Sequence, residues 1–370
     1  MPIDHKNPNK GTFNYTFQLK QGSPSGPTVL YIPGGPGGDA INAKINIFPT
    51  SFNQVYIDPR GVGCNYLDNT LPLSVINQDN HIDDLIEIVK SLNSSQLMIY
   101  GISYGTIAAT KLAHALESKN IPIHTVVLEG TVGHQNDVAA EKAYLSDEYL
   151  TIESRLYERY RDAFPYYQSE KKLFNIDQDS LDRFITYTLL FGVDYVGDFL
   201  QRAHLLSQKE ILSESEEKQK SSMIEDIYKY GAIDWNEPST SVVGKLNFFA
   251  SVRCENLGQA RSQEEICQNF HHLEGLPGYD SKNYKLKSPI YYLHSNPDIA
   301  TPIGGAYYHS QNQNKAQLKV FIESKGYGHH ATYFDDQLGP CTPKLFNLFY
   351  QLKPSRGDFS HVLDAEGHCL

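Results

Sequence analysis

Hydrophobic residues in the first third of the chain follow two alternating spacings. Short apolar runs bounded by proline or polar residues have the length of buried strands, and the stretches between them carry apolar residues every three to four positions, as on one face of a helix. The predicted strands are residues 12–20, 28–32, 54–57, 96–100 and 125–128. Predicted helices follow Asn80, a candidate N-cap, and residues 101–105. Because this order requires crossover connections, we predict a mostly parallel sheet covered by helices on both faces.

The spacing changes in the middle of the chain. Residues 133–284 carry apolar positions mostly at helical spacing. The remaining predicted elements are strands at 289–293 and 318–322 and a helix at 344–352. We therefore predict an α/β core made of residues 1–132 and 285–370, interrupted by a large, mostly helical cap domain at 133–284.

The charge balance argues against a polyanionic partner. The 370 residues contain 32 Lys and Arg against 43 Asp and Glu, a formal net charge of −11. An acidic surface repels phosphate backbones, and no basic cluster offsets it, so we do not expect nucleic acid to bind. No apolar run approaches the ~18 residues of a membrane-spanning helix, so no membrane-embedded segment is expected. The polar segment 213–222 is expected to be mobile.

The most specific chemical signal is G-I-S-Y-G at residues 101–105. It follows a predicted strand and opens a predicted helix, which is the context of a nucleophile elbow. A serine on such a sharp turn has strained backbone geometry and an exposed hydroxyl, and the first amides of the new helix can stabilise an oxyanion. We therefore predict that Ser103 is a nucleophile; a serine in an ordinary tight turn is the alternative.

A nucleophilic serine needs a base and an orienting carboxylate. Asp298 and His329 each follow a predicted strand of the C-terminal part, so both are expected at the sheet edge that carries Ser103. The chain order serine, acid, histidine is a known order for such a triad. We favour His329 over the adjacent His330 because Gly328 permits a tight backbone turn before it. A pair of histidines on a solvent-exposed loop is the alternative.

Glycines after the strand at 28–32 predict a second part of the oxyanion site. The segment P-G-G-P-G-G at 33–38 lacks the lysine and the spacing of a phosphate-binding loop, which argues against a nucleotide. The backbone N–H groups of Gly35 and Tyr104 are the predicted oxyanion donors. Arg60, which follows the next strand, is predicted to brace this glycine loop; a solvated surface arginine is the alternative.

Five cysteines bear on the cellular compartment. Cys254 and Cys267 are close in sequence, as are Cys341 and Cys369. Disulfides within these two pairs would leave Cys64 outside both. No C-x-x-C or H-E-x-x-H spacing indicates a metal site, and no cofactor is expected. If the pairs are bridged, we expect a secreted or periplasmic protein whose leader is absent from this chain. Five reduced thiols in a cytoplasmic protein are the alternative.

These segments together resemble the prolyl aminopeptidase and tripeptidyl aminopeptidase family of α/β-hydrolase serine peptidases, over nearly the whole chain. The matching segments are P-G-G-P-G-G at 33–38, D-P-R-G-V-G at 58–63, G-I-S-Y-G-T at 101–106, V-L-E-G at 127–130, Asp298 with Thr301-Pro302, and Gly328-His329. The resemblance implies the α/β-hydrolase fold and an exopeptidase that acts on peptides with a free amino terminus. It carries over Ser103, Asp298 and His329 as the triad.

The same resemblance suggests how the amino terminus is held. Glu255, in A-S-V-R-C-E-N at 250–256, is the candidate group that grips the α-ammonium of the substrate, and a glutamate on a solvated helix face is the alternative. Glu265 and Glu274 are candidates for a second acid. Cys341 and Cys369 lie where secreted tripeptidyl aminopeptidase relatives carry a disulfide.

Two departures from the family pattern leave the length of the released product open. Pro33 opens the glycine loop, as in the tripeptidyl branch, where prolyl aminopeptidases usually have histidine, and Ile102 replaces a common glycine. We therefore predict release of an N-terminal, proline-like residue or of a short peptide. An esterase or other acyl hydrolase of the same fold is one alternative, because fold and triad do not specify the leaving group. A catalytically silent binding protein of this fold is another; the sequence does not indicate the oligomeric state.

Overall fold

One seven-stranded sheet organises the part of the chain that the structure describes. The computed structural model describes residues 1–41, 45–67, 73–135, 193–209, 211–231, 243–258, 275–295, 300–324 and 341–351, and residues 180, 184, 267, 270, 273, 298 and 329. The strands are β1 (Phe17–Lys20), β2 (Thr28–Ile32), β3 (Asn53–Ile57), β4 (Leu97–Ile102), β5 (Thr125–Glu129), β6 (Ile290–Ser295) and β7 (Lys319–Ser324). Their order across the sheet is β1-β3-β2-β4-β5-β6-β7.

The sheet is mostly parallel, as predicted. β1 pairs antiparallel with β3, and every other neighbouring pair is parallel. The first predicted strand, 12–20, is shorter than expected, because pairing with β3 begins only at Phe17 opposite Ile57. Parallel neighbours align their carboxyl ends, so β4, β5, β6 and β7 all end at the same edge of the sheet.

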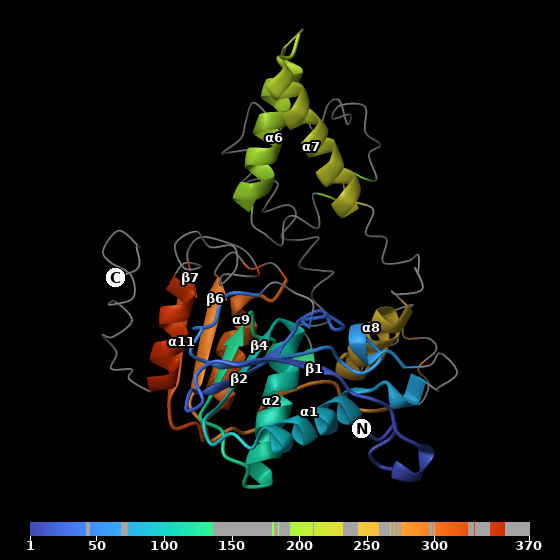
Figure 1. The fold of residues 1–370 in the computed structure, drawn as a ribbon, viewed down its shortest axis with the longest axis vertical. Coiled ribbons are helices and arrows are strands. Elements are labelled where there is room, and N and C mark those ends of the chain that lie inside the picture. The colour runs from blue at the N-terminus through green and yellow to red at the C-terminus, as the bar shows by residue number, and fades with distance from the viewer. Residues whose placement is uncertain are drawn as a thin grey trace.

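Helices cover both faces of this sheet (Figure 1). The helices of the described residues are α1 (Gln78–Leu92), α2 (Tyr104–Ser118), α6 (Val193–Ser207), α7 (Glu214–Gly231), α8 (Val243–Asn256), α9 (Ile303–Asn312) and α11 (Thr342–Gln351). Asn80 is not the N-cap of α1: the helix starts at Gln78, and the Asn77 side chain caps it by accepting from the Asn80 amide at 2.8 Å. No helix within the described ranges has both the length and the apolar character to cross a membrane.

Alternate residues of the central strands build two separate apolar cores. Leu30 and Ile32 of β2 pack in a cluster with α1 and α2. Val29 and Tyr31 of the same strand pack on the opposite face, in a cluster that includes α11. A strand covered on both faces has no solvated side, which explains why β2 is a continuous apolar run.

The polar segment 213–222, which the sequence predicts to be mobile, contributes residues 214–222 to the start of α7. The Glu216 carboxylate accepts hydrogen bonds from the Ser213 amide at 2.9 Å and from the Ser213 hydroxyl at 2.8 Å. A glutamate that returns to the amide three residues earlier satisfies one of the unpaired donors at a helix start. This cap, which is readable in the sequence as S-E-S-E, allows α7 to begin despite its few apolar residues.

The helices of the inserted region differ in how they relate to the sheet. α8 packs on the core through Phe248 and Val252, which share a cluster with α1 and α2. α6 and α7 contact each other and lie away from the sheet in Figure 1. Much of 133–284 lies outside the described residues, and its division from the core stays a prediction.

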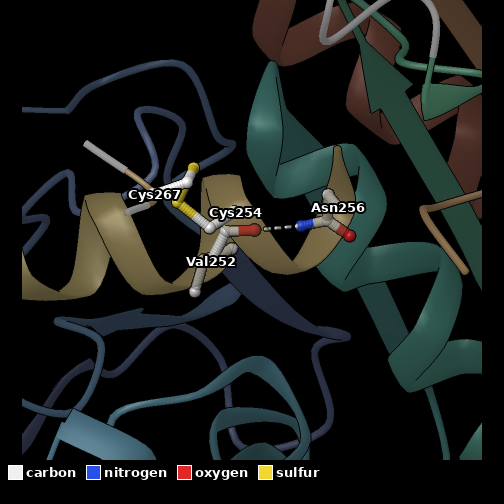
Figure 2. Close-up of a disulfide and its surroundings, with 4 residues drawn as sticks. All are labelled: Val252, Cys254, Asn256 and Cys267. Carbon is white, nitrogen blue, oxygen red and sulfur yellow. Dashed lines mark hydrogen bonds between the residues drawn. A yellow bond between two sulfur atoms is a disulfide. The ribbon is translucent and has the colours of Figure 1, made fainter. Parts of the chain in front are cut away.

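Cys254 in the last turn of α8 forms the predicted disulfide with Cys267, with the Cα atoms 5.5 Å apart (Figure 2). Beside it, Asn256 donates to the Val252 carbonyl at 2.8 Å (Figure 2). Both cysteines are buried in a small apolar cluster with Leu257. The disulfide therefore ties the end of α8 to the chain that follows it.

Candidate active site

Ser103 occupies a strained turn between β4 and α2. Its backbone has φ 55° and ψ −128°, a region that non-glycine residues rarely adopt, and it is the N-cap residue of α2. The Ser103 amide donates to the Glu129 carbonyl at 2.8 Å, and its carbonyl accepts from the Thr106 amide and hydroxyl at 2.8 and 2.6 Å. These bonds to β5 and to the first turn of α2 hold the strained conformation.

The glycine loop runs directly alongside this serine. A Cβ added at Gly34 would lie 2.9 Å from the Ser103 Cβ, so only glycine allows this approach. Tyr104 is the first residue of α2, and its amide therefore has no acceptor within the helix. The two predicted oxyanion donors, Gly35 and Tyr104, thus belong to segments that flank Ser103, and neither amide has a backbone acceptor among the described residues.

Asp298 and His329 form a buried hydrogen-bonded pair. His329 Nδ1 lies 2.9 Å from Asp298 Oδ2 and 3.1 Å from Oδ1, and the two residues are 6% and 4% exposed. Asp298 also accepts from the Thr301 hydroxyl at 2.6 Å and from the Ala300 and Thr301 amides at 2.9 Å each. These donors converge on one carboxylate.

The environment of Asp298 keeps the carboxylate ionised. Burial alone would raise its pKa, but the charge of the His329 imidazole and the hydrogen bonds from His329 and the Thr301 hydroxyl outweigh burial and hold the pKa of Asp298 well below its ordinary range. An ionised carboxylate fixes the imidazole with Nδ1 toward the acid, which leaves Nε2 for proton transfer.

Ser103 and His329 both lie next to the end of β5. Glu129 accepts from the Ser103 amide, and a Cβ added to the next residue, Gly130, would lie 3.0 Å from His329 Cε1 and 2.9 Å from Thr301 Oγ1. The described contacts contain no hydrogen bond between Ser103 Oγ and the His329 ring. Such bonds are often long in ligand-free enzymes and tighten when substrate is bound.

Arg60 is fully buried but does not brace the glycine loop. Its guanidinium donates to both Asp84 oxygens at 2.7 Å, and to the carbonyls of Ile3 and Val75 at 2.7 and 3.0 Å. It therefore ties the N-terminal segment to α1, because a planar guanidinium pairs best with a carboxylate that can take two parallel bonds.

Asp58, two residues before Arg60, performs the bracing that was predicted for the arginine. It accepts from the Ala40 and Ile41 amides at 2.7 and 3.0 Å, just after the glycine loop, and from the Cys64 amide at 2.9 Å. An aspartate directly before proline at a strand end is the sequence signal that could have identified it.

Glu255 lies at the N-terminal end of α1. Its Oε2 accepts from the Gln78 amide at 3.0 Å, and burial, opposed by the charge of Lys111 and by this bond, raises the pKa of Glu255. Gln78 in turn donates to the Tyr104 hydroxyl at 3.0 Å. The predicted amine-binding carboxylate is therefore linked to the residue after Ser103 through one buried side chain.

Several other predicted residues can be placed only in part. Cys341 is disulfide-bonded, while its predicted partner Cys369 lies outside the described residues, as do Glu265 and Glu274. Cys64 is exposed. Within the described ranges, no group of three or more His, Cys, Asp or Glu side chains is arranged to hold a metal ion.

Comparison with known proteins defines the fold. No protein-family model and no curated protein matches the sequence. The structure is similar to that of proline iminopeptidase from Mycobacterium smegmatis, with a TM-score of 0.50 and 11% identity over 90% of this chain and 94% of that chain. It is also similar to a serine hydrolase from Cycloclasticus zankles (TM-score 0.49, 15% identity, 92% of this chain and 95% of that chain). The strand order and the first similarity show that the chain has the α/β-hydrolase fold.

Proposed function

We propose that this protein is a serine hydrolase that works through an acyl-enzyme on Ser103. The observation that carries the proposal is the buried Asp298–His329 pair at the sheet edge where Ser103 opens α2. A strained serine beside an imidazole held by an ionised carboxylate is the arrangement that acyl transfer requires.

Each group has one role in the proposed mechanism. The Ser103 side chain first turns toward the imidazole. His329 Nε2 then takes the proton of the Ser103 hydroxyl while the serine oxygen attacks the substrate carbonyl. The amides of Gly35 and Tyr104 hold the oxyanion. His329 then protonates the leaving amine, and a water molecule that it deprotonates releases the acyl group. Asp298 keeps the imidazole oriented throughout.

We further propose that the substrate is a peptide with a free amino terminus, cleaved after a proline-like first residue or a short N-terminal peptide. The motif resemblance over nearly the whole chain and the fold shared with a proline iminopeptidase support this choice. Residues 133–284 would act as a cap that shields the acyl-enzyme from water.

Glu255 is the proposed anchor for the α-ammonium of that peptide. An ammonium paired with a poorly solvated carboxylate gives a charge-assisted bond that an N-blocked peptide cannot form. One carboxylate oxygen of Glu255 accepts from the Gln78 amide, so the ammonium would share Glu255 with the start of α1.

We propose a secreted or periplasmic location for the enzyme. The Cys254–Cys267 disulfide and the disulfide-bonded state of Cys341 support it, because thiols stay reduced in most cytoplasmic proteins. Intact-mass measurement of protein isolated from its native compartment, with and without reductant, tests the bridges; unchanged mass would favour the cytoplasmic alternative.

Covalent labelling tests the serine hydrolase. A fluorophosphonate probe should label the wild-type protein at Ser103, and labelling should be lost in Ser103→Ala and fall strongly in His329→Gln. The neighbouring variant His330→Gln is the matched control and should label normally. Absence of labelling in the wild type would favour a catalytically silent binding protein.

A substrate panel tests the aminopeptidase. Proline and alanine β-naphthylamides, each with a free or an acetylated amine, should be cleaved only in the free form, and p-nitrophenyl esters provide the esterase comparison. Glu255→Gln should raise KM for free-amine substrates and leave ester cleavage little changed. Ester cleavage that is indifferent to acetylation, without amide cleavage, would indicate an esterase instead.

A further inference from the structure

A second histidine lies beside the acid of the proposed triad. His294, on β6, has a fully buried side chain whose Nε2 is 3.8 Å from Asp298 Oδ2, and Asp298 itself is 1% exposed at its side chain. The triad motif does not include this residue. Two imidazoles therefore approach the same carboxylate oxygen, since His329 Nδ1 lies 2.9 Å from Asp298 Oδ2.

The backbone determines which nitrogen of His294 carries the proton. The Thr131 amide donates to His294 Nδ1 at 3.4 Å, in a buried position. An amide N–H can only donate, so Nδ1 must be the unprotonated, accepting nitrogen. A neutral imidazole has one N–H group, which must then be on Nε2, the nitrogen that faces Asp298.

We propose that His294 is a positioning residue: a neutral imidazole that directs its Nε2–H toward Asp298 and holds the carboxylate toward His329. This role rests on the proposed function. His294 and His329 differ in whether they can accept a second proton. Protonation of His294 would place an Nδ1–H against the Thr131 N–H, so the proton removed from Ser103 stays on His329.

The neighbours of Asp298 and the acids on the strands beside His294 define the control for a charge effect. Asp298 faces His329 and His294, together with the uncharged donors Thr301 and Ala300. On β7 the register partner of His294 is Glu323, and on β5 the nearest acid is Glu129, which accepts from the Tyr100 hydroxyl. Glu323→Gln is therefore the matched control for a charge effect from the neighbouring strand.

The pH dependence of ester cleavage tests the role. In His294→Phe the carboxylate loses one donor, so it should attract the proton on His329 more strongly and move the acid limb of kcat/KM to higher pH. We expect kcat to fall about tenfold with little change in KM, because the carboxylate loses the buried N–H dipole 3.8 Å from Oδ2 and is held less firmly toward His329. His294→Gln, which keeps an N–H donor, should restore most of the rate and the limb, and Glu323→Gln should shift neither.

Coupling separates a positioning role from a general packing defect. In the Asp298→Asn background, His294→Phe should have almost no further effect on kcat, because the group through which it acts is gone. An equal effect in both backgrounds would overturn the proposal. Wild-type protein that is neither labelled by fluorophosphonate nor active on esters would instead refute the proposed function itself.

The tautomer of His294 can be measured in the wild-type protein by a method that does not depend on enzyme activity. Nitrogen-15 imidazole NMR of the wild-type protein, with the His294 signals assigned by their absence in His294→Gln, should show protonated Nε2 and unprotonated Nδ1. A proton on Nδ1, or a doubly protonated ring at neutral pH, would overturn the inference whatever the catalytic results.

Discussion

Two shielded carboxylates in this molecule have pKa values that are shifted in opposite directions. Asp298, at the carboxyl edge of the sheet, receives two backbone amides, a hydroxyl and an imidazole, and its pKa is lowered. Glu255, at the junction of α1 and α8, receives one amide, with the charges of Lys111 and Lys6 nearby, and burial raises its pKa.

The difference shows that burial does not decide the charge of a carboxylate by itself. The number of donors that touch the oxygens decides whether the cost of desolvation is exceeded. The sheet edge supplies such donors because a loop turns back on Asp298, whereas the α1–α8 junction offers the carboxylate little beyond one helix start. The first environment suits an orienting acid, and the second suits a group whose partner arrives with a ligand.

The largest effect is expected from neutralising the acid at the sheet edge. Asp298→Asn should lower kcat by about 10⁴-fold, because the amide favours the wrong imidazole tautomer while shape is preserved. Acid stability should also change: a lowered native pKa contributes stability above the unfolded pKa and loses it as pH falls through the native value. Steady-state kinetics and urea unfolding from pH 2 to 7 measure both. A variant with near wild-type kcat would contradict the acid's role.

Removing the Cys254–Cys267 disulfide tests the region around the end of α8. The double variant Cys254→Ser, Cys267→Ser opens a loop with a sequence separation of 13 residues, which should cost about 3 kcal/mol of unfolding free energy in the chain-entropy model. Urea denaturation measures the loss, and the exposed Cys64→Ser is the control. At temperatures where the variant is folded, Ser103 labelling should persist; its loss would show that the two regions are not separable.

A methyl group at the end of β5 tests the geometry of the base. Gly130 has φ 58°, and the Cβ of Gly130→Ala would meet Thr301 Oγ1 at 2.9 Å and His329 Cε1 at 3.0 Å. Displacing the ring should lower kcat/KM about a hundredfold. Gly304→Ala, whose Cβ meets nothing within 4 Å, is the matched control and should keep full activity. Equal activity of the two variants would argue against the placement of His329.

The smallest effect is expected at Glu255. Because burial raises its native pKa, the stability that it contributes is present below the unfolded pKa and is lost as pH rises through the native value. Glu255→Gln removes this loss, so its unfolding free energy should exceed that of the wild type at pH 7 by about 0.5 kcal/mol and converge with it near pH 4. Urea titrations at both pH values test the sign, and a difference that grows toward low pH would reverse it.

Much of the fold could be predicted from local pattern. β2 was located to the residue and α2 and β5 closely, because apolar spacing reports which side chains are buried, whatever packs on them. Ser103 was also identifiable, since strand, turn and helix are adjacent in sequence. The start of α1 was misplaced because both Asn77 and Asn80 are candidate caps, and only backbone geometry distinguishes them.

Residues far apart in the chain were harder to relate. Arg60 was assigned to the wrong segment because its partner, Asp84, lies on a helix that the sequence cannot orient. No role was predicted for His294, because a histidine within a strand has no distinguishing pattern in the neighbouring sequence. The sequence by itself determined the order of elements, the strained serine and its expected partners, since these depend on neighbours in the chain. Only the tertiary structure decided which distant donors reach each carboxylate, because a pKa depends on atoms close in space and a linear pattern contains no distances.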